Sequence, residues 1–215
     1  MGVVCYLAPS SDLLTDEKDQ QPLVTAASLL REGRVVLLPT DTVYGLAVSV
    51  DAYPGGPEPL FVIKHRDPHK TIAWLIDSID MFNSYGKEIP PYAYRLAEQF
   101  WPGGLTLVVK ASDAVPPAYR RQDGTIGLRI PAFGPTQQII GNLGCALATT
   151  SANLSGYPTP ATYQEIDDII KSQIDMALVA PCPCSTLAST IVVCTGPEPV
   201  IVREGTIPSR QIMSL

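Results

Sequence analysis

Basic side chains gather in one short segment that follows an apolar run, FVIKHRDPHK at residues 61–70. Lys64, Arg66 and Lys70 all lie within it. Pro68 prevents a regular helix from continuing through the segment, so we expect these side chains to spread from a loop and to converge. A planar guanidinium fork and a compact ammonium suit phosphate or carboxylate oxygens. The segment therefore predicts an anion site, and the solvated end of a helix is the alternative.

Both histidines of the chain, His65 and His69, belong to the same segment and are four residues apart. On a helix this spacing would resemble a pair of metal ligands, but Pro68 breaks the helix and no carboxylate or cysteine cluster completes a site. The cysteines are odd in number and fit no zinc spacing; they are Cys5, Cys145, Cys182, Cys184 and Cys194. We predict reduced thiols and no metal site from protein side chains, as in cytoplasmic proteins. A redox pair of Cys182 and Cys184 is the alternative.

Hydroxyl side chains follow two predicted strands at the point where each strand ends. The stretch LLPTDTVYGL, residues 37–46, presents Thr40 and Thr42, and the stretch LATTSANLSGYPTP, residues 147–160, presents Ser151 among other small residues. Ligands of open α/β sheets bind beyond the carboxyl ends of strands. Small residues also let a ligand approach the backbone. We expect both segments to line a site, and ordinary turns with local hydroxyl bonds are the alternative.

A single arginine lies within an otherwise apolar predicted strand, TIGLRI at residues 125–130. Strand alternation puts Arg129 on the same face as Thr125 and Gly127. A buried arginine needs a partner, and either a substrate carboxylate or an internal aspartate or glutamate would serve.

Alternating helices and strands must position these residues. Apolar periodicity predicts helices over residues 23–32, 57–65, 78–85, 91–100, 135–142 and 162–172. Strands are predicted over residues 34–39, 45–50, 71–76, 105–110, 125–130, 145–149, 189–194 and 199–204. Gly33 is expected to end the first helix, and Asp77 to cap the third. Some strands are linked too briefly for helical crossovers, so we predict an α/β fold with a mixed sheet.

The bulk composition excludes several classes of protein. The chain has 215 residues, of which 46% are hydrophobic and 17% charged, so it can bury a core. No apolar run approaches the roughly 20 residues of a membrane span, and the N-terminus does not resemble a signal peptide. A net charge of −6 argues against a broad grip on nucleic acid, although a local basic cleft is compatible with it. There is no Walker motif and no dinucleotide glycine fingerprint.

Six blocks in sequence order resemble those of the YrdC-like proteins, the threonylcarbamoyl-AMP synthases. They are PTDTVYGL, KHRDPHK, FWPGGLTLVVK, TIGLRIP, TTSANLSGYPTP and the closing pieces STIVV and IVREG. The resemblance covers about residues 22–207, within a single predicted domain of residues 1–215. It implies a YrdC-like twisted mixed sheet flanked by helices around a large concave cleft. Gly104 stands where proline is usual, and Leu75 where some relatives have a histidine.

The resemblance also implies a reaction. L-Threonine and bicarbonate form a carbamate, whose carboxylate attacks the α-phosphorus of ATP, so that pyrophosphate leaves and threonylcarbamoyl-AMP remains. This intermediate would serve the modification of adenosine 37 in tRNA. The implied partners are ATP, L-threonine and bicarbonate, with Mg²⁺ carried by the nucleotide and with tRNA or the threonylcarbamoyl-transferase complex as further partners.

Two other functions stay open. A YciO-like paralogue would bind nucleotide or double-stranded RNA without this activity. A relative of hydrogenase maturation proteins would act on simple carbamoyl groups, but those proteins carry extra zinc-finger-like and acylphosphatase domains, for which 215 residues leave no room.

The site residues that the resemblance implies fall into three groups. The catalytic pair is Lys64 and Arg66. The ATP-binding residues are Arg66, Lys70, Thr149, Ser151, Asn153, Thr159 and Arg203. The threonine-binding residues are Thr40, Thr125, Arg129 and Ser189. The charge of the first two groups suits the reaction, because negative charge develops on the leaving pyrophosphate and fixed cations would stabilise it. No protein nucleophile is needed.

Overall fold

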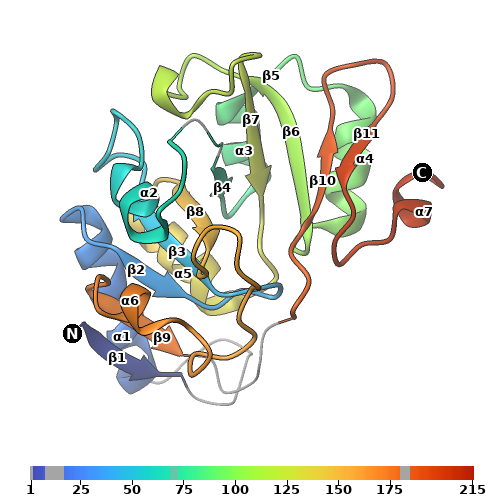
Figure 1. Ribbon diagram of the computed structural model, residues 1–215. Helices are drawn as coiled ribbons and strands as arrows, with labels where there is room; N and C mark the ends of the chain where they lie inside the picture. Colours follow the sequence, from blue (N-terminus) through green and yellow to red (C-terminus); the bar gives the residue numbers. More distant parts are fainter. Residues whose placement is uncertain (1, 8–16, 69, 71, 180–184) are drawn as a thin grey trace.

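The computed structural model describes residues 2–7, 17–68, 70, 72–179 and 185–215 (Figure 1). Within them, eleven strands form one sheet in the order β1-β9-β2-β3-β8-β4-β7-β6-β10-β11, with β5 beside β6. The strands are β1 (Val3–Tyr6), β2 (Val36–Leu38), β3 (Gly45–Ser49), β4 (Ala73–Leu75), β5 (Gly86–Lys87), β6 (Leu105–Ala111), β7 (Thr125–Arg129), β8 (Leu147–Ser151), β9 (Met176–Val179), β10 (Thr190–Val193) and β11 (Val200–Arg203). The helices are α1 (Glu17–Arg31), α2 (Glu58–Lys64), α3 (Ile79–Tyr85), α4 (Pro91–Phe100), α5 (Gly134–Leu143), α6 (Asp168–Lys171) and α7 (Ser209–Ile212), with a 3-10 turn at Pro117–Tyr119.

The sheet is mixed, which confirms the predicted α/β class. Strand β9 pairs in parallel with β1 and β2, β4 with β7, and β6 with β10. The other pairs, including β3 with β8 and β6 with β7, are antiparallel. Figure 1 shows that the sheet is strongly twisted, with β1 at one end of the molecule and β11 at the other.

One face of the sheet carries the larger hydrophobic core. Trp74, Leu107 and Leu128 point to this face and are fully buried. They pack in the same cluster as Phe82 of α3 and Leu96 of α4. Successive residues of a strand point to opposite faces, so the neighbours of these three residues must face the other side.

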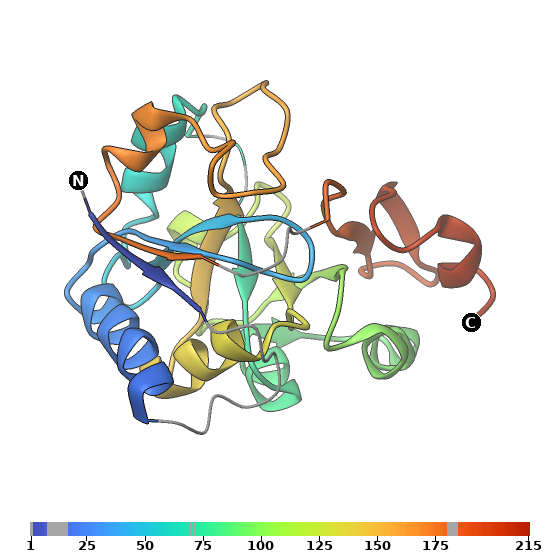
Figure 2. The same ribbon diagram turned by 90° about the horizontal axis from the view of Figure 1, so that it is seen from below.

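The opposite face is partly covered by α1 and α5, which lie side by side (Figure 2). Leu23 of α1 and Ile139 of α5 are fully buried there with Val36 of β2. The remainder of this face runs over β4, β7, β6 and β10 and lines the main pocket.

Most predicted elements lie within two residues of their expected bounds, and two differ more. Helix α1 begins at Glu17 and carries Pro22 inside it, whereas the prediction began at residue 23. The reason is that residues 17–21 are all polar and give no apolar periodicity. Gly33 follows the helix with φ of 75° and ends it as predicted.

The helix predicted over residues 162–172 is reduced to α6. The Glu165 carboxylate accepts the N–H of Ala161 at 2.9 Å, and the Asp167 carboxylate accepts that of Ile169 at 2.8 Å. Such bonds compete with the helical ladder, so the helix begins only after Asp167. Helix α3 is likewise capped one residue later than predicted, by Ser78, whose hydroxyl accepts the N–H of Met81.

Three four-residue elements had no counterpart in the prediction, and neither did the two-residue strand β5 or the 3-10 turn at Pro117–Tyr119. Strands β1 and β9 pair with each other at one end of the sheet. Helix α7 closes the described chain. All three have only four residues, too few for periodicity to be recognised.

Candidate active site

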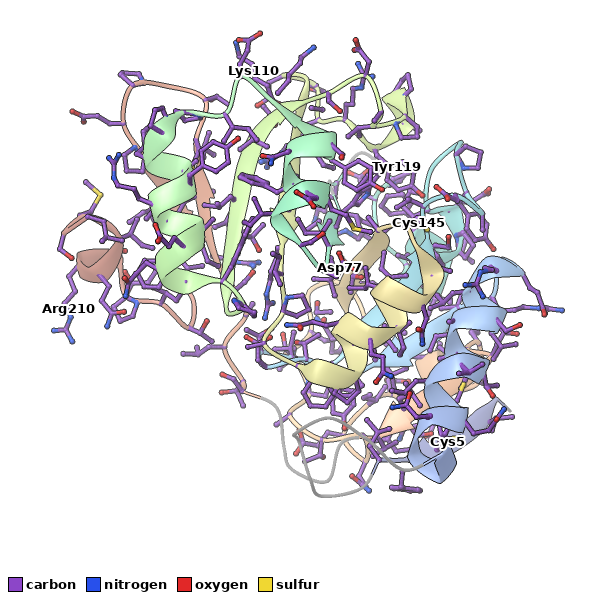
Figure 3. The ribbon with its side chains drawn as sticks, turned by 180° about the vertical axis from the view of Figure 1, so that it is seen from behind. Cys5, Asp77, Lys110, Tyr119, Cys145 and Arg210 are labelled. Carbon is purple, nitrogen blue, oxygen red and sulfur yellow. The ribbon has the colours of Figure 1, made fainter. Side chains whose placement is uncertain are left out.

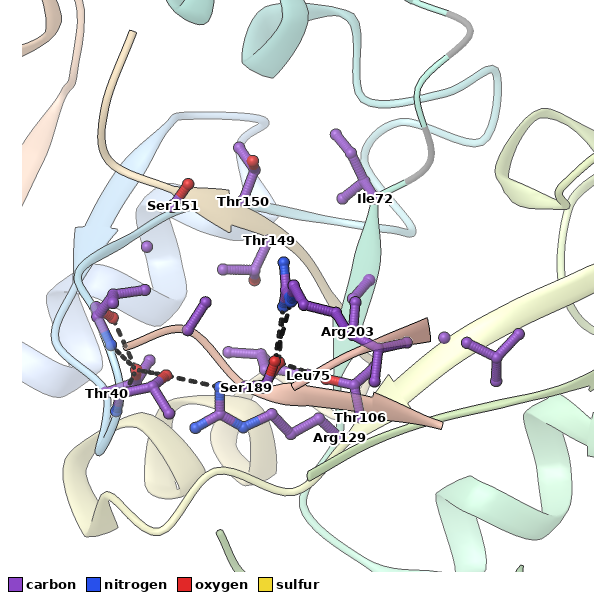
Figure 4. A pocket seen from close by; sticks show the side chains of 18 of the residues that line it. Thr40, Ile72, Leu75, Thr106, Arg129, Thr149, Thr150, Ser151, Ser189 and Arg203 are labelled. Carbon is purple, nitrogen blue, oxygen red and sulfur yellow. Dashed lines mark hydrogen bonds between the residues drawn. The ribbon is translucent and has the colours of Figure 1, made fainter. Parts of the chain in front are cut away.

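The main pocket has a volume of about 260 Å³ and lies on the same face of the sheet as α1 and α5. Gly127 opens its floor, because a Cβ there would lie 3.3 Å from Cγ2 of Thr106 and 3.7 Å from Cβ of Ala73. Figure 4 shows the side chains that surround it. Several strand ends and the turn after β2 meet here, as expected for a site at strand ends.

The lining of this pocket is cationic and rich in hydroxyl groups. Its arginines are Arg66, Arg121, Arg129 and Arg203. Its hydroxyl residues are Thr40, Thr42, Thr106, Thr149, Thr150, Ser151 and Ser189. No aspartate or glutamate is found among the described residues that line it. The pocket is therefore suited to an anionic ligand, although the whole chain is acidic.

Arg129 has an internal carboxylate partner. Its Nη2 donates to Oδ1 of Asp41 at 2.6 Å, its Nη1 to Oγ1 of Thr42 at 2.7 Å and its Nε to the Gly103 carbonyl at 2.8 Å. Burial lowers the pKa of Arg129, and the charge of Asp41 opposes this. Of the two partners considered for this arginine, the structure contains the internal one. A ligand carboxylate would have to share the guanidinium with Asp41.

The turn after β2 is held by its own hydroxyl groups. Oγ1 of Thr40 accepts the N–H groups of Thr42 and Val43, each at 3.1 Å, and donates to the Val43 carbonyl at 2.7 Å. These are the local bonds of an ordinary turn. The same two threonines also line the pocket, so both interpretations of this stretch apply together.

Arg203 reaches the pocket from β11, the last strand. Its Nε and Nη2 donate to the Ser189 carbonyl at 3.0 and 2.9 Å, and Ser189 Oγ lies 2.8 Å from Oγ1 of Thr106 (Figure 4). Burial, and then repulsion from Arg66, lowers the pKa of Arg203. Two cations therefore repel each other in the pocket, and an anion between them would relieve this repulsion.

The basic segment at residues 61–70 is arranged differently from our expectation. Helix α2 extends through Lys64 and ends at His65, whose φ of 49° is left-handed, three residues before Pro68. Arg66 lines the pocket, and burial lowers its pKa. Lys64 and Lys70 do not converge with it. The three cations thus do not spread from one loop, because the first of them still belongs to the helix.

Lys64 is only 1% exposed and is not among the pocket-lining residues. Its Nζ donates to the carbonyl oxygens of Ser151 and Asn153 and, at 3.3 Å, to Oδ1 of Asn153. Lys70 is exposed and lines a neighbouring hollow of about 700 Å³. That hollow shares Arg121 and Ile72 with the main pocket.

The end of β8 and the loop that follows it line two different hollows. Thr149 and Ser151 line the main pocket, whereas Asn153 and Thr159 line a separate hollow next to Glu165. Ser151 Oγ donates to Oδ1 of Asn153 at 2.5 Å. Within this stretch, a hydrogen bond thus connects two of the residues expected to bind ATP, but the expected residues do not all face the same pocket.

Thr125 lies at the opposite end of β7 from Arg129. Its Oγ1 donates to Oδ1 of Asp123 at 2.6 Å, and it does not line the main pocket. Alternation placed the two residues on one face correctly, but the length of the strand separates them.

Four residues in or beside the pocket received no individual ligand role from the sequence, although two of them lie in a stretch already expected to line a site. Asp41 and Thr42 hold Arg129, Thr106 holds Ser189, and Arg121 lines both the main pocket and the neighbouring hollow. Asp41 and Thr42 lie in the stretch at residues 37–46 that was expected to line a site, and only their contact with Arg129 was not predicted. The loop that carries Arg121, RRQDG, gave no signal of its own.

The metal and redox predictions are only partly covered by the structure. His69, Cys182 and Cys184 lie outside the described residues. In the part of the chain that is described, no group of three or more His, Cys, Asp or Glu side chains could hold a metal ion. Cys5 lies beside α1 and Cys145 follows α5 (Figure 3), and both are free thiols. None of the described helices is long and apolar enough to cross a membrane.

Comparison with known proteins points to one family. The model of the Sua5/YciO/YrdC family, described as telomere recombination, matches residues 28–205. The threonylcarbamoyl-AMP synthase of Pyrococcus abyssi is 32% identical over 188 residues, which cover 87% of this chain and 55% of that protein. That of Bacillus subtilis is 32% identical over 206 residues, 93% of this chain and 58% of that protein. The chain thus spans somewhat more than half the length of these curated relatives.

Solved structures agree with this result. The crystal structure of P. abyssi Sua5 complexed with L-threonine has a TM-score of 0.85 and 28% identity, covering 100% of this chain and 60% of that one. The crystal structure of Escherichia coli YciO has a TM-score of 0.85 and covers 99% of this chain and 100% of that one. At 24% identity, the YciO comparison shows the fold alone.

Proposed function

Because the chain belongs to the Sua5/YciO/YrdC family, we propose that it is an L-threonylcarbamoyladenylate synthase. It joins ATP, bicarbonate and L-threonine into threonylcarbamoyl-AMP and releases pyrophosphate. The product serves the modification of adenosine 37 in tRNA, through tRNA itself or a transferase complex as the next partner. The names of the P. abyssi and B. subtilis relatives support this assignment.

The observation that carries the proposal is the charge of the main pocket. Four arginines line it, and the described lining residues include no carboxylate. ATP and the carbamate formed from threonine are both anions, and negative charge grows on the departing pyrophosphate. Fixed cations and hydroxyl dipoles would stabilise that charge without reorganising during the reaction.

The reaction requires the protein to position the substrates and does not require a nucleophile from the protein. The amine of threonine attacks the carbon of bicarbonate or of carbon dioxide derived from it, and a carbamate forms with loss of water. A carbamate oxygen then attacks the α-phosphorus of ATP, and the bond from that phosphorus to the bridging oxygen breaks as pyrophosphate leaves. Holding both anions in line at one place supplies most of the catalysis.

We assign the two substrates to the two sides of the pocket. Arg66 and Arg203 face the phosphates, with Thr149 and Ser151 offering hydroxyl groups. Threonine lies by Thr40, Arg129 and Ser189, and the L-threonine complex of P. abyssi Sua5 supports an amino-acid ligand in this fold. Mg²⁺ arrives bound to the phosphates, since no carboxylate is found in the described lining.

The nucleotide extends beyond the main pocket in this proposal. A volume of about 260 Å³ lies below the roughly 300–1,000 Å³ of ordinary ligand sites, and the site must hold ATP together with the carbamate of threonine. The neighbouring hollow of about 700 Å³ continues from it across Arg121. Lys70 lines that hollow, so ATP spanning both spaces would contact this lysine after all.

The test is pyrophosphate release from purified protein with ATP, bicarbonate and threonine, and with each one omitted. We expect release only when all three are present, and a much lower rate with other amino acids. Release that ignores bicarbonate would refute the assignment. ATP binding with no release under any condition would indicate a nucleotide-binding protein without this activity.

A further inference from the structure

The ammonium of Lys64 is engaged by a loop rather than by the pocket. It donates to the carbonyl oxygens of Ser151 and Asn153 and to the side-chain oxygen of Asn153. An ammonium has three donors, and these three acceptors match them in number. The link also runs in the other direction, because the N–H of Ser155 donates to the Lys64 carbonyl at 3.0 Å. The end of α2 and the loop at residues 151–155 are therefore fastened together at four points.

This fastening bears directly on the pocket. Ser151 is both the last residue of β8 and a pocket-lining residue, and it is joined to Lys64 through its own carbonyl. Its hydroxyl is oriented by Asn153, which Lys64 also holds. Arg66, two residues after Lys64 and just beyond the end of α2, lines the same pocket. One buried ammonium thus fixes the relative placement of Ser151 and Arg66.

A charge in this position is costly. Lys64 is 1% exposed, and among the described residues it forms no ion pair with a carboxylate. Burial and, to a lesser extent, the charge of Arg66 together lower its pKa from 10.5 to about 8. A methionine of similar length would fill the space without burying a charge. Packing alone therefore does not account for a lysine here, whereas three converging acceptors do.

We propose that Lys64 is a positioning residue, whose ammonium fixes the loop at residues 151–155 so that the nucleotide side of the pocket is formed before ATP binds. This inference rests on the proposed synthase function. It assigns Lys64 a role through Ser151 and Asn153, in place of the direct catalytic role that the family resemblance implied.

Lys64→Met tests the proposal, because it keeps the length of the side chain and removes all three donors. The Kd and the KM for ATP should rise at least tenfold, while kcat changes less than about threefold. The Kd for threonine should stay within twofold, because Thr40 and Ser189 are held by other bonds. Lys171→Met is the matched control, because the Lys171 ammonium also donates to a backbone carbonyl, that of Gln164 at 3.1 Å, but its described partners, Gln164, Asp168 and the Tyr163 ring, all lie outside residues 151–155. It should leave all four constants unchanged.

A second measurement is independent of turnover. Amide hydrogen exchange over residues 151–157 should become faster in Lys64→Met and stay unchanged in Lys171→Met. If Lys64→Met fails to fold, Lys64→Gln replaces it, since a neutral amide retains two donors and should give a smaller change of the same kind. Unchanged exchange in this loop would overturn the proposal even if the protein is a synthase. A fall in kcat above a hundredfold at constant ATP affinity would also overturn it. An inactive wild type would refute the synthase assignment, while the exchange result would still decide whether Lys64 fixes the loop.

Discussion

At the scale of single residues, Arg66 is the cation whose removal should be most informative. It lines the pocket, and its charge adds to the larger effect of burial in lowering the pKa of Arg203 and of Lys64. If it contacts the phosphates, Arg66→Ala loses a charge-assisted bond of about 1.5–3 kcal/mol. This lowers kcat/KM roughly ten- to 150-fold. Arg66→Lys should restore only part of the activity, because the ammonium lacks the fork. The measurement compares kcat/KM and Tm for the wild type, Arg66→Ala and Arg66→Lys. Wild-type turnover by Arg66→Ala would mean that Arg66 is only part of the solvated end of a helix.

Arg121 is the pocket arginine that the sequence did not reveal. Among the described residues its side chain forms no hydrogen bond or ion pair, so Arg121→Gln should change Tm very little. If ATP spans both hollows, the substitution should raise the KM for ATP roughly tenfold, the equivalent of about 1.4 kcal/mol. Arg95→Gln on the exposed surface of α4 is the control and should behave as wild type. Equal ATP constants for both variants would confine the nucleotide to the main pocket.

Lys64 also gives the free energy of unfolding a defined pH dependence. Burial and the neighbouring charge of Arg66 lower its pKa from 10.5 to about 8. Between these values the unfolded chain binds the proton and the folded protein does not, so the free energy of unfolding rises with pH in this window. Denaturant unfolding at about pH 8 and at about pH 9.5 should show the wild type gaining stability relative to Lys64→Met. A constant difference between the two proteins would contradict an ammonium buried at this depth.

Residue types and spacing located some of these side chains and not others. Arg66, Arg203, Thr40, Ser189 and Ser151 were all expected at a ligand site, and all line the main pocket. Lys64 is buried by a loop that comes almost ninety residues later in the chain, so the sequence around Lys64 could not predict this burial. The alternation of residues along a strand predicted the face of the sheet on which Thr125 lies. It did not predict how far along β7 this residue lies from the pocket.

At the scale of elements, the pairing of β3 with β8 depends on a glycine. Gly45 lies opposite Ser151 in the register, and a Cβ on Gly45 would lie 2.6 Å from Cγ2 of Thr149. Gly45→Ala should therefore destabilise the protein by about 1–3 kcal/mol through overpacking. Thr149→Ser keeps the hydroxyl and removes the methyl group, so the double variant should recover most of the loss. The double-mutant cycle, followed by denaturant unfolding, should give a coupling of at least about 0.5 kcal/mol. Additive losses would show that the two strands separate instead.

Elements with strong periodicity were predictable, and short ones were not. Helix α4 was predicted at its observed bounds, because apolar positions recur across its ten residues. The four residues of β9 give too little signal, although they are fully buried between β1 and β2. The polar start of α1 and the capped start of α6 show the two ways in which a helix boundary departs from periodicity: polar residues can still be helical, and side-chain bonds can end a helix early.

At the scale of the whole molecule, the fold and the family agree with the six sequence blocks. The chain combines a net charge of −6 with a pocket lined by four arginines. An acidic body around a cationic pocket favours small anions that can enter it over long nucleic acids that would lie across the surface. This arrangement was only partly predictable, because the sequence gives the number of arginines whereas the long-range strand order brings Arg66, Arg129 and Arg203 together.

The central claim is that this pocket joins a carbamate of threonine to AMP. The most direct measurement is mass spectrometry of the reaction product formed from ATP, L-threonine and either ordinary or ¹³C-labelled bicarbonate. The account predicts threonylcarbamoyl-AMP in both reactions, heavier by one mass unit with the labelled bicarbonate, and pyrophosphate in equal amount. A nucleotide product that lacks the label, or pyrophosphate released without any threonine-containing adenylate, would contradict it.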